Sequence, residues 1–414
     1  MPTLEYNNFD FNSPKFKKSE QVASNAAELT IDSIKNGSPY YNIFSIDLSI
    51  AMANACQNYA NEIKANFSDL IVIGMGGAVL NPQSLVNLCH YNQSNINIHF
   101  LHNTDPFYLQ SLFKKISLKK CAVLAISNSG DTLETNSLVG VMISEYKKAG
   151  IEDLGKNFYF ITNLKSGILH GIAKKINAKL IAHQEQISGR YSGLSNVTSF
   201  IAQIAGIDIR AFFDGAASVI DNFIKEGAKS SPARSAASIH GAGLELMVNI
   251  GYLQSFSVYL EWYSQIIAES IGKNGGGITP IRGLGPNDQH SMMQLYLDGK
   301  KDKLYSLFYV NDLPKDFRTS DINELGYMSN KALSDINTAN FEATKLALIK
   351  NGLPVRTIIL EDLSAKSIGQ LTAHSMLEII TLCNMFKINP FDQPGVELIK
   401  KESRILVQKL ESNS

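Results

Sequence analysis

Residues 69–75 read DLIVIGM, a short apolar run that sets the pattern for the fold prediction. Three similar runs, each bounded by turn residues, follow it at 96–102 (INIHFLH), 121–127 (CAVLAIS) and 157–163 (NFYFITN). Longer helical patterns separate these runs, and this alternation predicts parallel β-α-β units. After a helix-rich passage at 195–246, three further runs continue the alternation at 254–260, 303–310 and 355–362. The sequence therefore predicts an α/β protein with two units in tandem.

The length of the chain also favours two domains. At 414 residues it exceeds the ~250–300 residues at which single hydrophobic cores stop growing. No linker rich in Pro, Gly or Ser marks the boundary. The expected organisation is a first domain with an N-terminal helical segment at 1–205, a second domain at 206–390, and a C-terminal helix at 391–414 that packs back on the body.

Composition narrows the class of partner. The chain is 44% apolar and carries 38 basic and 38 acidic residues, with no basic block or basic stripe interleaved with aromatic residues. A nucleic-acid or membrane partner is therefore not expected, and a small molecule is. The N-terminus has no cationic start followed by an apolar core, and no apolar run nears the ~18 residues of a membrane helix, so we expect a cytoplasmic protein. Four dispersed cysteines form no CxxC or Cys/His ligand pattern, which predicts buried, reduced thiols.

Candidate acid/base residues lie in the stretch QIIAESIGKNGGGITPIRGLGPNDQHSMMQLYL at 265–297. Glu269 ends an apolar helical run, and His290 follows 21 residues later at the head of another apolar-periodic segment. A side chain at the end of an element can face a cleft while its backbone stays anchored, which suits a base and a proton relay. Taken alone, either residue is more often a capping Glu or an ordinary semi-buried His.

A candidate anion site follows the run at 121–127. The segment SNSGDTLET at 127–135 supplies the hydroxyls of Ser127, Ser129 and Thr132, and Gly130 allows a sharp turn before the next helix. Successive amides at such a turn can point into one concavity and cradle a phosphate. The alternative is an N-cap rich in Ser and Thr, followed by favourable first-turn acids.

A glycine-rich turn, GMGGAVLNP at 74–82, follows the first strand-like run. The dinucleotide fingerprint would need a glycine at position 79, where this chain has Val79, and the turn is not a Walker A loop. A nicotinamide cofactor is therefore not expected.

Two further segments each contain one candidate cation. SGRYSGLS at 188–195 contains Arg190, and NPFDQPGVELIKKES at 389–403 contains Lys400. An arbitrary Arg is usually a surface salt-bridge former, and most helix lysines are solvated. Next to reacting atoms, however, a fixed guanidinium can stabilise a developing oxyanion.

These five elements, in the order in which they occur along the chain, resemble the motifs of the glucose-6-phosphate isomerase (phosphoglucose isomerase) family, in a compact bacterial-type version. The segment 127–135 resembles the phosphate loop of sugar isomerase (SIS) domains, SxSGxTxE, and 74–82 resembles the family turn GIGGSxLGP. The segments 188–195 and 389–403 resemble GGRxS and NPFDQPGVExGK, and 265–297 resembles the signature region of the family. The sequence departs from the usual residue at four positions, with Ala78 for Ser, Asn81 for Gly, Asn128 for Lys and Ile399 for Gly.

The resemblance implies a fold and an activity. The fold is two tandem SIS-type, flavodoxin-like αβα sandwich domains with mostly parallel sheets, plus N- and C-terminal helices. The activity is interconversion of glucose 6-phosphate and fructose 6-phosphate through a cis-enediolate, in glycolysis and gluconeogenesis, with no metal or other cofactor. The alternatives are an isomerase of relaxed specificity that also takes mannose 6-phosphate, and a noncatalytic SIS protein that senses sugar phosphates.

The resemblance also implies roles for individual residues. Glu269 moves the proton between C2 and C1, His290 with Lys400 opens the sugar ring, and Arg190 faces the enediolate. The substrate phosphate is bound by Gly76, Gly77, Ser127, Asn128, Ser129 and Thr132. The family resemblance further implies a homodimer with active sites at the interface, in which His290 reaches the partner's site.

Overall fold

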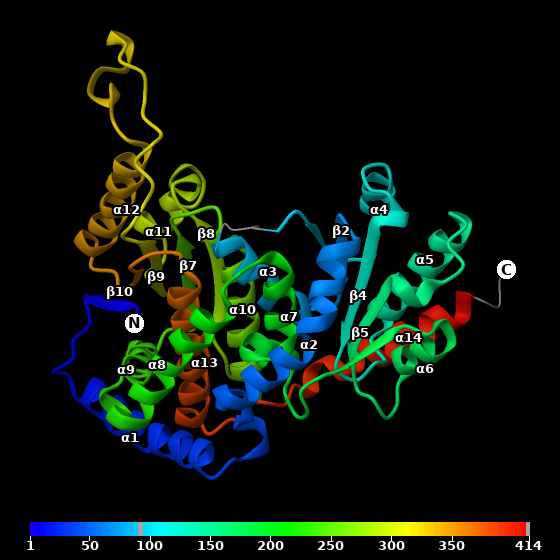
Figure 1. Cartoon of the computed structure of the whole chain (residues 1–414). Helices are drawn as coiled ribbons and strands as arrows, with labels where there is room; N and C mark the ends of the chain where they lie inside the picture. Colours follow the sequence, from blue (N-terminus) through cyan, green and yellow to red (C-terminus); the bar gives the residue numbers. More distant parts are fainter. Residues whose placement is uncertain (90–93, 411–414) are drawn as a thin grey trace. The chain divides into compact units, whose positions relative to one another are not determined.

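The computed structural model describes residues 1–89 and 94–410, and its elements form two α/β units (Figure 1). One unit, here the Arg190 unit, consists of Gly37–Phe213 and Phe391–Ser414. The other, the Glu269 unit, consists of Met1–Asn36 and Asp214–Pro390. The predicted domain boundaries at 205 and 390 stay a prediction, and residues 411–414 of the expected C-terminal helix lie outside the described residues.

The sheet of the Arg190 unit is entirely parallel, with strand order β3-β2-β4-β5-β6. Its strands are β2 (Asp69–Ile73), β3 (Asn97–Leu101), β4 (Cys121–Ser127), β5 (Phe158–Thr162) and β6 (Lys179–Ala182). Every residue of β2, β4 and β5 is buried. Central parallel strands are covered on both faces, which explains why they were readable as continuous apolar runs.

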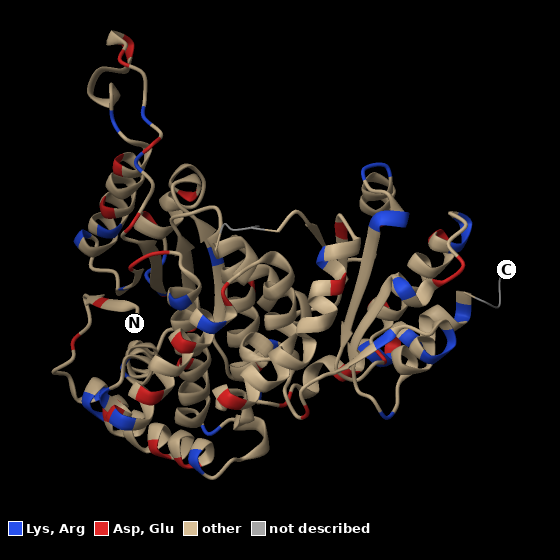
Figure 2. Ribbon diagram, in the orientation of Figure 1, with Lys and Arg blue, Asp and Glu red and all other residues tan. Residues whose placement is uncertain are grey.

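Helices cover both faces of this sheet. Alternate residues of β2 face opposite layers, since Leu70 and Val72 belong to one core cluster, and Ile71 and Ile73 to the other. The first layer contains α2 (Ile46–Asn66), α3 (Gly77–Cys89) and α7 (Asn196–Ala205). The second contains α4 (Pro106–Phe113), α5 (Leu133–Lys148) and α6 (Ile168–Ile176). Helix α7 has no charged residue (Figure 2) and is buried throughout. The C-terminal helix α14 (Glu397–Leu410) has no buried residue.

The sheet of the Glu269 unit has the order β1-β10-β9-β7-β8, in which only β1 runs antiparallel to its neighbour. Its strands are β1 (Thr3–Asn7), β7 (Leu246–Gly251), β8 (Thr279–Leu284), β9 (Lys303–Val310) and β10 (Val355–Leu360). Its helices are α1 (Pro14–Lys35), α8 (Ile209–Glu226) from Asp214 onward, α9 (Ser231–Ala242), α10 (Phe256–Ile271), α11 (Met293–Asp298), α12 (Leu333–Lys350) and α13 (Ala365–Met385).

A buried ion pair lies at the centre of this unit. Arg356 on β10 and Glu378 on α13 are fully buried and contact each other, and Ser235 and Tyr263 donate hydrogen bonds to the same carboxylate. Burial acts to raise the pKa of Glu378, but the attraction of Arg356 and these hydrogen bonds hold that pKa below its ordinary value. A buried charge pair with its hydrogen bonds satisfied fixes the relative positions of the elements that supply it.

The predicted fold class is confirmed, since both units have mostly parallel sheets with helices, and helices lie near both termini. One element is different. Residues 254–260, which the alternation assigns to a strand, contain the start of α10, so that prediction is wrong. Seven residues are too few to separate a period of 2 from one of 3.6, whereas over the whole helix the buried Phe256, Leu260, Tyr263 and Ile267 recur every three or four residues. In the described parts of the chain, no helix combines the length and the hydropathy that a membrane crossing needs.

Candidate active site

The loop between β4 and α5 carries the predicted anion-binding hydroxyls. Ser127 is buried at the end of β4, and its Oγ lies 2.9 Å from Oγ1 of Thr132 and accepts a hydrogen bond from the Gly130 amide at 3.1 Å. Thr132 is the N-cap residue of α5, but its side chain caps no amide of the helix. The first amides of a helix have no intrahelical acceptor and carry the positive end of its dipole. This loop is therefore suited to bind an anion.

The shape of the loop requires glycine at position 130. Gly130 has φ +74°, and a Cβ there would lie 3.0 Å from Oγ1 of Thr162. The Gly130 carbonyl accepts a hydrogen bond from the Leu169 amide, and Oδ1 of Asp131 accepts one from the Ile168 amide at 2.9 Å. These bonds support the loop against the β5–α6 connection before any ligand binds.

A cavity of about 310 Å³ adjoins this loop. It lies beyond the ends of β4, β5 and β6, where open parallel sheets bind their ligands, and is lined in part by Asn128, Lys165 and His183. Burial lowers the pKa of His183, so that its ring is neutral near pH 7. Most of the residues that line the cavity are polar, and they include Lys165, whose Nζ pairs with the exposed Glu185 at 3.5 Å.

The glycine-rich turn packs against the segment that contains Arg190. Gly76 has φ +55°, and α3 begins at Gly77. A Cβ at Gly77 would come within 2.0 Å of the Gly189 carbonyl oxygen, so only glycine allows this approach. Gly189 starts the short helix η4 (Gly189–Leu194), and Arg190 is the next residue. The close approach of Gly77 to Gly189 therefore brings the glycine-rich turn next to the Arg190 segment, although the two are far apart in the sequence. The structure thus brings together three of the predicted elements in one unit.

Arg190 is 1% exposed and held in a defined orientation. Its Nη1 donates to Oε1 of Gln393 at 2.5 Å, its Nη2 donates to the Asp392 carbonyl at 3.0 Å, and its guanidinium carbon lies 5.3 Å from the centre of the Tyr191 ring. Phe391 packs on the rings of Tyr40, Tyr41 and Tyr191, which fixes the segment that supplies these acceptors. A surface salt-bridge role for Arg190 is therefore wrong, because the guanidinium is buried.

Lys400 differs from Arg190 in its environment. It lies on α14, its side chain is 61% exposed, and its Nζ pairs with Glu397 at 2.7 Å one turn earlier. Exposed pairs at this spacing contribute little to stability. The amine is thus accessible to a ligand or to another chain, and its assignment to ring opening stays a prediction.

In the other unit, Glu269 lies in the last turn of α10, where the sequence pattern placed it. The carboxylate is half-buried, and its Oε1 accepts a hydrogen bond from Nε2 of Gln265 at 2.9 Å, one turn earlier. The helix ends at Gly272, and Nζ of Lys273 donates to the Asn389 carbonyl at 2.5 Å. A carboxylate at a helix end, oriented by a neighbouring amide and reachable by solvent, can act as a general base.

His290 closes the short helix η6 (Asn287–His290). Asp288 accepts a hydrogen bond from the Leu284 amide, and Gln289 donates to the Asn340 carbonyl and to Thr344. The His290 side chain is exposed and takes no part in these anchoring bonds. The turn is thus fixed to its unit while the imidazole faces outward.

The sequence patterns missed three polar side chains near the candidate residues. Gln265 and Gln393 orient Glu269 and Arg190 respectively. Thr135 is fully buried in the first turn of α5, and in the described part of the chain its Oγ1 has no hydrogen-bond partner. Thr135 could have been found from its place in SNSGDTLET, three residues after Thr132, but the two glutamines could be recognised only from their contacts.

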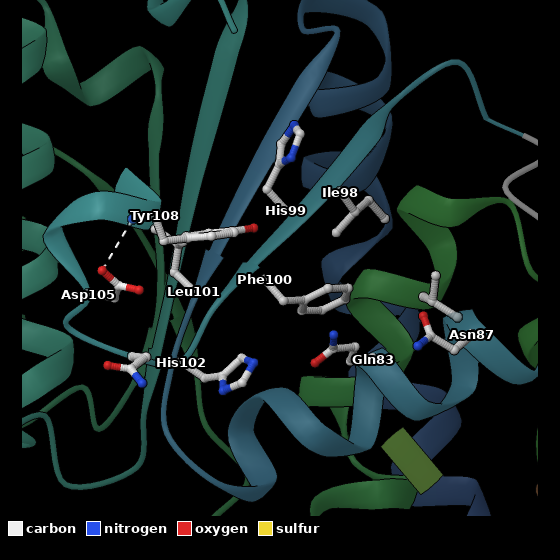
Figure 3. A pocket seen from close by; sticks show the side chains of 11 residues that line it. Gln83, Asn87, Ile98, His99, Phe100, Leu101, His102, Asp105 and Tyr108 are labelled. Atoms are coloured by element: carbon white, nitrogen blue, oxygen red, sulfur yellow. Dashed lines mark hydrogen bonds between the residues drawn. The ribbon is translucent and has the colours of Figure 1, made fainter. Parts of the chain in front are cut away.

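A larger cavity lies elsewhere. About 470 Å³ in volume, it borders the edge strand β3 and is lined by side chains from α3, β3 and α4, among them Gln83, His99 and Tyr108 (Figure 3). It contains none of the predicted site residues. Volume alone therefore does not identify the candidate active site.

Comparisons of the sequence and of the fold with known proteins all indicate the same family. The family model described as phosphoglucose isomerase matches residues 54–301 and 325–414. The glucose-6-phosphate isomerase of Campylobacter jejuni is 32% identical over 395 residues, covering 93% of this chain and 96% of that protein. That of Methanocaldococcus jannaschii is 32% identical over 343 residues, covering 81% and 83%. A solved glucose-6-phosphate isomerase from Chlamydia trachomatis shares the fold, with a TM-score of 0.84 at 20% identity over 99% of this chain and 89% of that chain. The chain belongs to the phosphoglucose isomerase family.

Proposed function

We propose that this protein is a cytoplasmic glucose-6-phosphate isomerase that interconverts glucose 6-phosphate and fructose 6-phosphate in glycolysis and gluconeogenesis. The observation that carries the proposal is the convergence, in one unit, of an anion-binding loop, a close-approach glycine turn and a buried, oriented Arg190. A sugar phosphate offers a phosphate group for the loop and the glycine turn, and a reacting oxygen for the guanidinium.

In this proposal, Glu269 carries the isomerisation. Its carboxylate removes the proton from C2 of the open-chain aldose, and the negative charge passes to the C1 carbonyl oxygen to give the cis-enediolate. The resulting carboxylic acid then delivers a proton to C1 while a proton moves from the C2 hydroxyl to O1, which gives the ketose. One base is enough because a single carboxylate can reach both C1 and C2 from the same face of a cis-enediolate. The hydrogen bond from Gln265 supports this role, because it orients the carboxylate.

The Arg190 unit would supply binding and charge stabilisation. The substrate phosphate would be bound by Ser127, Asn128, Ser129, Thr132 and the amides of Gly76 and Gly77. The energy of that interaction would position the reacting carbons, which lie at the other end of the substrate. Arg190 would face the enediolate oxygens. A buried guanidinium with its orientation already fixed needs little reorganisation during the reaction, which is the most effective form of electrostatic stabilisation.

Ring opening precedes isomerisation, because both sugars are mostly cyclic. His290, with Lys400, would move the proton between the anomeric hydroxyl and the ring oxygen. Both side chains are exposed in the single chain, which supports a role in a site that a second copy completes.

A homodimer is therefore part of the proposal. Residues 311–332 leave the body of the Glu269 unit as an extended arm (Figure 1, yellow) that exposes Phe317 at 71% and Tyr327 at 88%. Helix α14 likewise exposes several apolar side chains, among them Leu406 and Leu410. Exposed apolar groups of this size are typical of interaction surfaces. A sedimentation measurement that finds only monomer at micromolar concentration would refute the dimer.

The test of the function is a coupled assay on purified protein. Fructose 6-phosphate is supplied, and glucose 6-phosphate is detected with its dehydrogenase. Turnover of glucose and fructose 6-phosphates alone supports the proposal, and additional turnover of mannose 6-phosphate identifies the relaxed isomerase. Binding of these sugar phosphates without any turnover would instead identify the noncatalytic sensor.

A further inference from the structure

The segment that carries Arg190 is held by two asparagine side chains from different loops. Asn81 contacts it from α3, and Asn128 contacts it from the loop after β4. Both positions are among those where the sequence departs from the resembled motifs, which usually have Gly and Lys there. The two departures thus introduce amide groups at two points around one functional segment.

Asn81 joins the glycine turn to η4. Its side chain is 5% exposed, and Nδ2 lies 2.8 Å from the Gly77 carbonyl, 3.0 Å from the Gly189 carbonyl and 3.2 Å from Oγ of Ser192. Its two amide hydrogens are shared among these three acceptors. Ser192 in turn donates to the Gly189 carbonyl at 2.7 Å. The peptide before Arg190 and the side chain two residues after it are therefore fixed to α3 by one residue.

Asn128 fixes the other side of the same segment. Its Nδ2 donates to the Ile187 carbonyl at 2.9 Å, three residues before Arg190. At the far end, the guanidinium is oriented by Gln393 and Asp392. The backbone of Arg190 and its charged group are thus positioned separately, and only the backbone depends on the two asparagines.

We propose that Asn81 and Asn128 are positioning residues that place Arg190 for stabilisation of the enediolate. The inference rests on the proposed isomerase function. Losing either amide frees the 187–192 backbone to shift, and a displacement of about 1 Å at an electrostatic group can lower a rate by up to about 100-fold. Because Arg190 acts on the transition state, the loss falls on kcat more than on KM.

The position of Asn128 gives this inference a distinctive consequence. Asn128→Lys adds a cation to the anion-binding loop and removes the bond to Ile187. It therefore lowers KM, or the inhibition constant of inorganic phosphate, and lowers kcat at the same time. If Asn128 served only phosphate binding, the added charge would improve affinity without the loss of kcat.

The experiment is a double-mutant cycle on the full chain, assayed with fructose 6-phosphate. Asn81→Ala and Asn128→Ala are each made alone and with Arg190→Lys, and Asn87→Ala is the control, because it removes the same side chain from the same helix α3. We expect kcat to fall about tenfold or more in each single asparagine variant, and to be unchanged in the control. In the Arg190→Lys background the same asparagine substitutions should have little further effect, because the group they position is already altered.

The inference would be overturned if the fold-decrease in kcat of each double variant equalled the product of the two single-variant decreases. That result would show that the asparagines act independently of Arg190. The inference would also be overturned if both asparagine variants kept the original kcat. If Asn81→Ala fails to fold, Asn128→Ala decides alone, because it alters an exposed loop residue. Absence of activity in the unmutated protein would refute the proposed function, whereas activity with multiplicative effects would refute only this inference.

Discussion

Replacing Ser127 by Ala tests the anion-binding loop most sharply. Ser127 is 4% exposed, and its hydroxyl contacts Thr132 and accepts a hydrogen bond from the Gly130 amide. That amide also donates to the Ser127 carbonyl at 3.2 Å, so it keeps an acceptor in the variant. The structural cost should therefore be that of one ordinary hydrogen bond, about 0.5–1.5 kcal/mol. The bond to a phosphate oxygen is charge-assisted and contributes about 1.5–3 kcal/mol.

Since about 1.4 kcal/mol corresponds to a factor of ten, Ser127→Ala should raise KM for fructose 6-phosphate by about 10- to 150-fold and weaken inhibition by inorganic phosphate in parallel. Ser137→Ala is the matched control, because Ser137 is an exposed residue of α5, one turn beyond the loop. Steady-state kinetics give KM, and thermal unfolding shows whether the fold is retained. An unchanged KM and phosphate inhibition, in a variant that folds, would mean that the phosphate binds elsewhere.

Two further predictions concern assembly and pH. Co-refolding Glu269→Gln and His290→Ala chains should restore part of the activity that each variant lacks, because one site of a mixed dimer then has both groups intact; mixed dimers that form but stay inactive would place the site within one chain. The free energy of unfolding should decrease as the pH falls from about 6.5 towards 4, because burial lowers the pKa of His374 from 6.5 to about 4, and the unfolded chain then binds a proton that the native chain excludes. This lowering of the His374 pKa from 6.5 to about 4 corresponds to about 3 kcal/mol of unfolding free energy. In urea unfolding, the stability of His374→Gln should therefore depend less on pH than that of the unmodified protein. An equal pH dependence of the two unfolding free energies would contradict this origin.

The parts of the fold that the sequence predicts well are those where local pattern and burial agree. The strands β2, β4 and β5 are buried at every residue, and each is a continuous apolar run. The strand β7 is buried at every residue except Leu246, but the more conspicuous apolar stretch after it belongs to α10. Gly243, which ends α9 with φ +62°, is the signal that could have identified β7 as the next element.

Two other strands depend on tertiary pairing. The residues of β1 are partly buried after an exposed Thr3, without the alternation of a half-buried strand. The strand forms because it pairs with β10, some 350 residues later in the chain. The strand β8 contains Pro280 and has one buried residue, Gly283. Neither segment has a local signal that separates it from a loop, so both needed the structure.

The candidate site shows the same division. The types of residue at the loop and the turn could be read from the sequence, because glycines and hydroxyls at strand ends have local geometric reasons to be there. The orientation of Arg190 could not, because its acceptors at 392 and 393 lie about 200 residues away. Likewise, Asn81 and Asn128 read as losses against the resembled motifs, whereas in the structure each makes a new bond to the Arg190 segment.

Glu269 is proposed to carry one proton between C2 and C1, and conversion of fructose 6-phosphate in D2O measures this step directly. A carboxylic acid exchanges its proton with solvent, so proton NMR should find deuterium at C2 of the glucose 6-phosphate that forms. Glu269→Gln keeps the size of the side chain but not its basicity, and both turnover and deuterium incorporation should fall by about 10²- to 10⁴-fold with the fold retained. Near-normal turnover by a folded Glu269→Gln protein, or deuterium incorporation that persists in that variant, would contradict the mechanism.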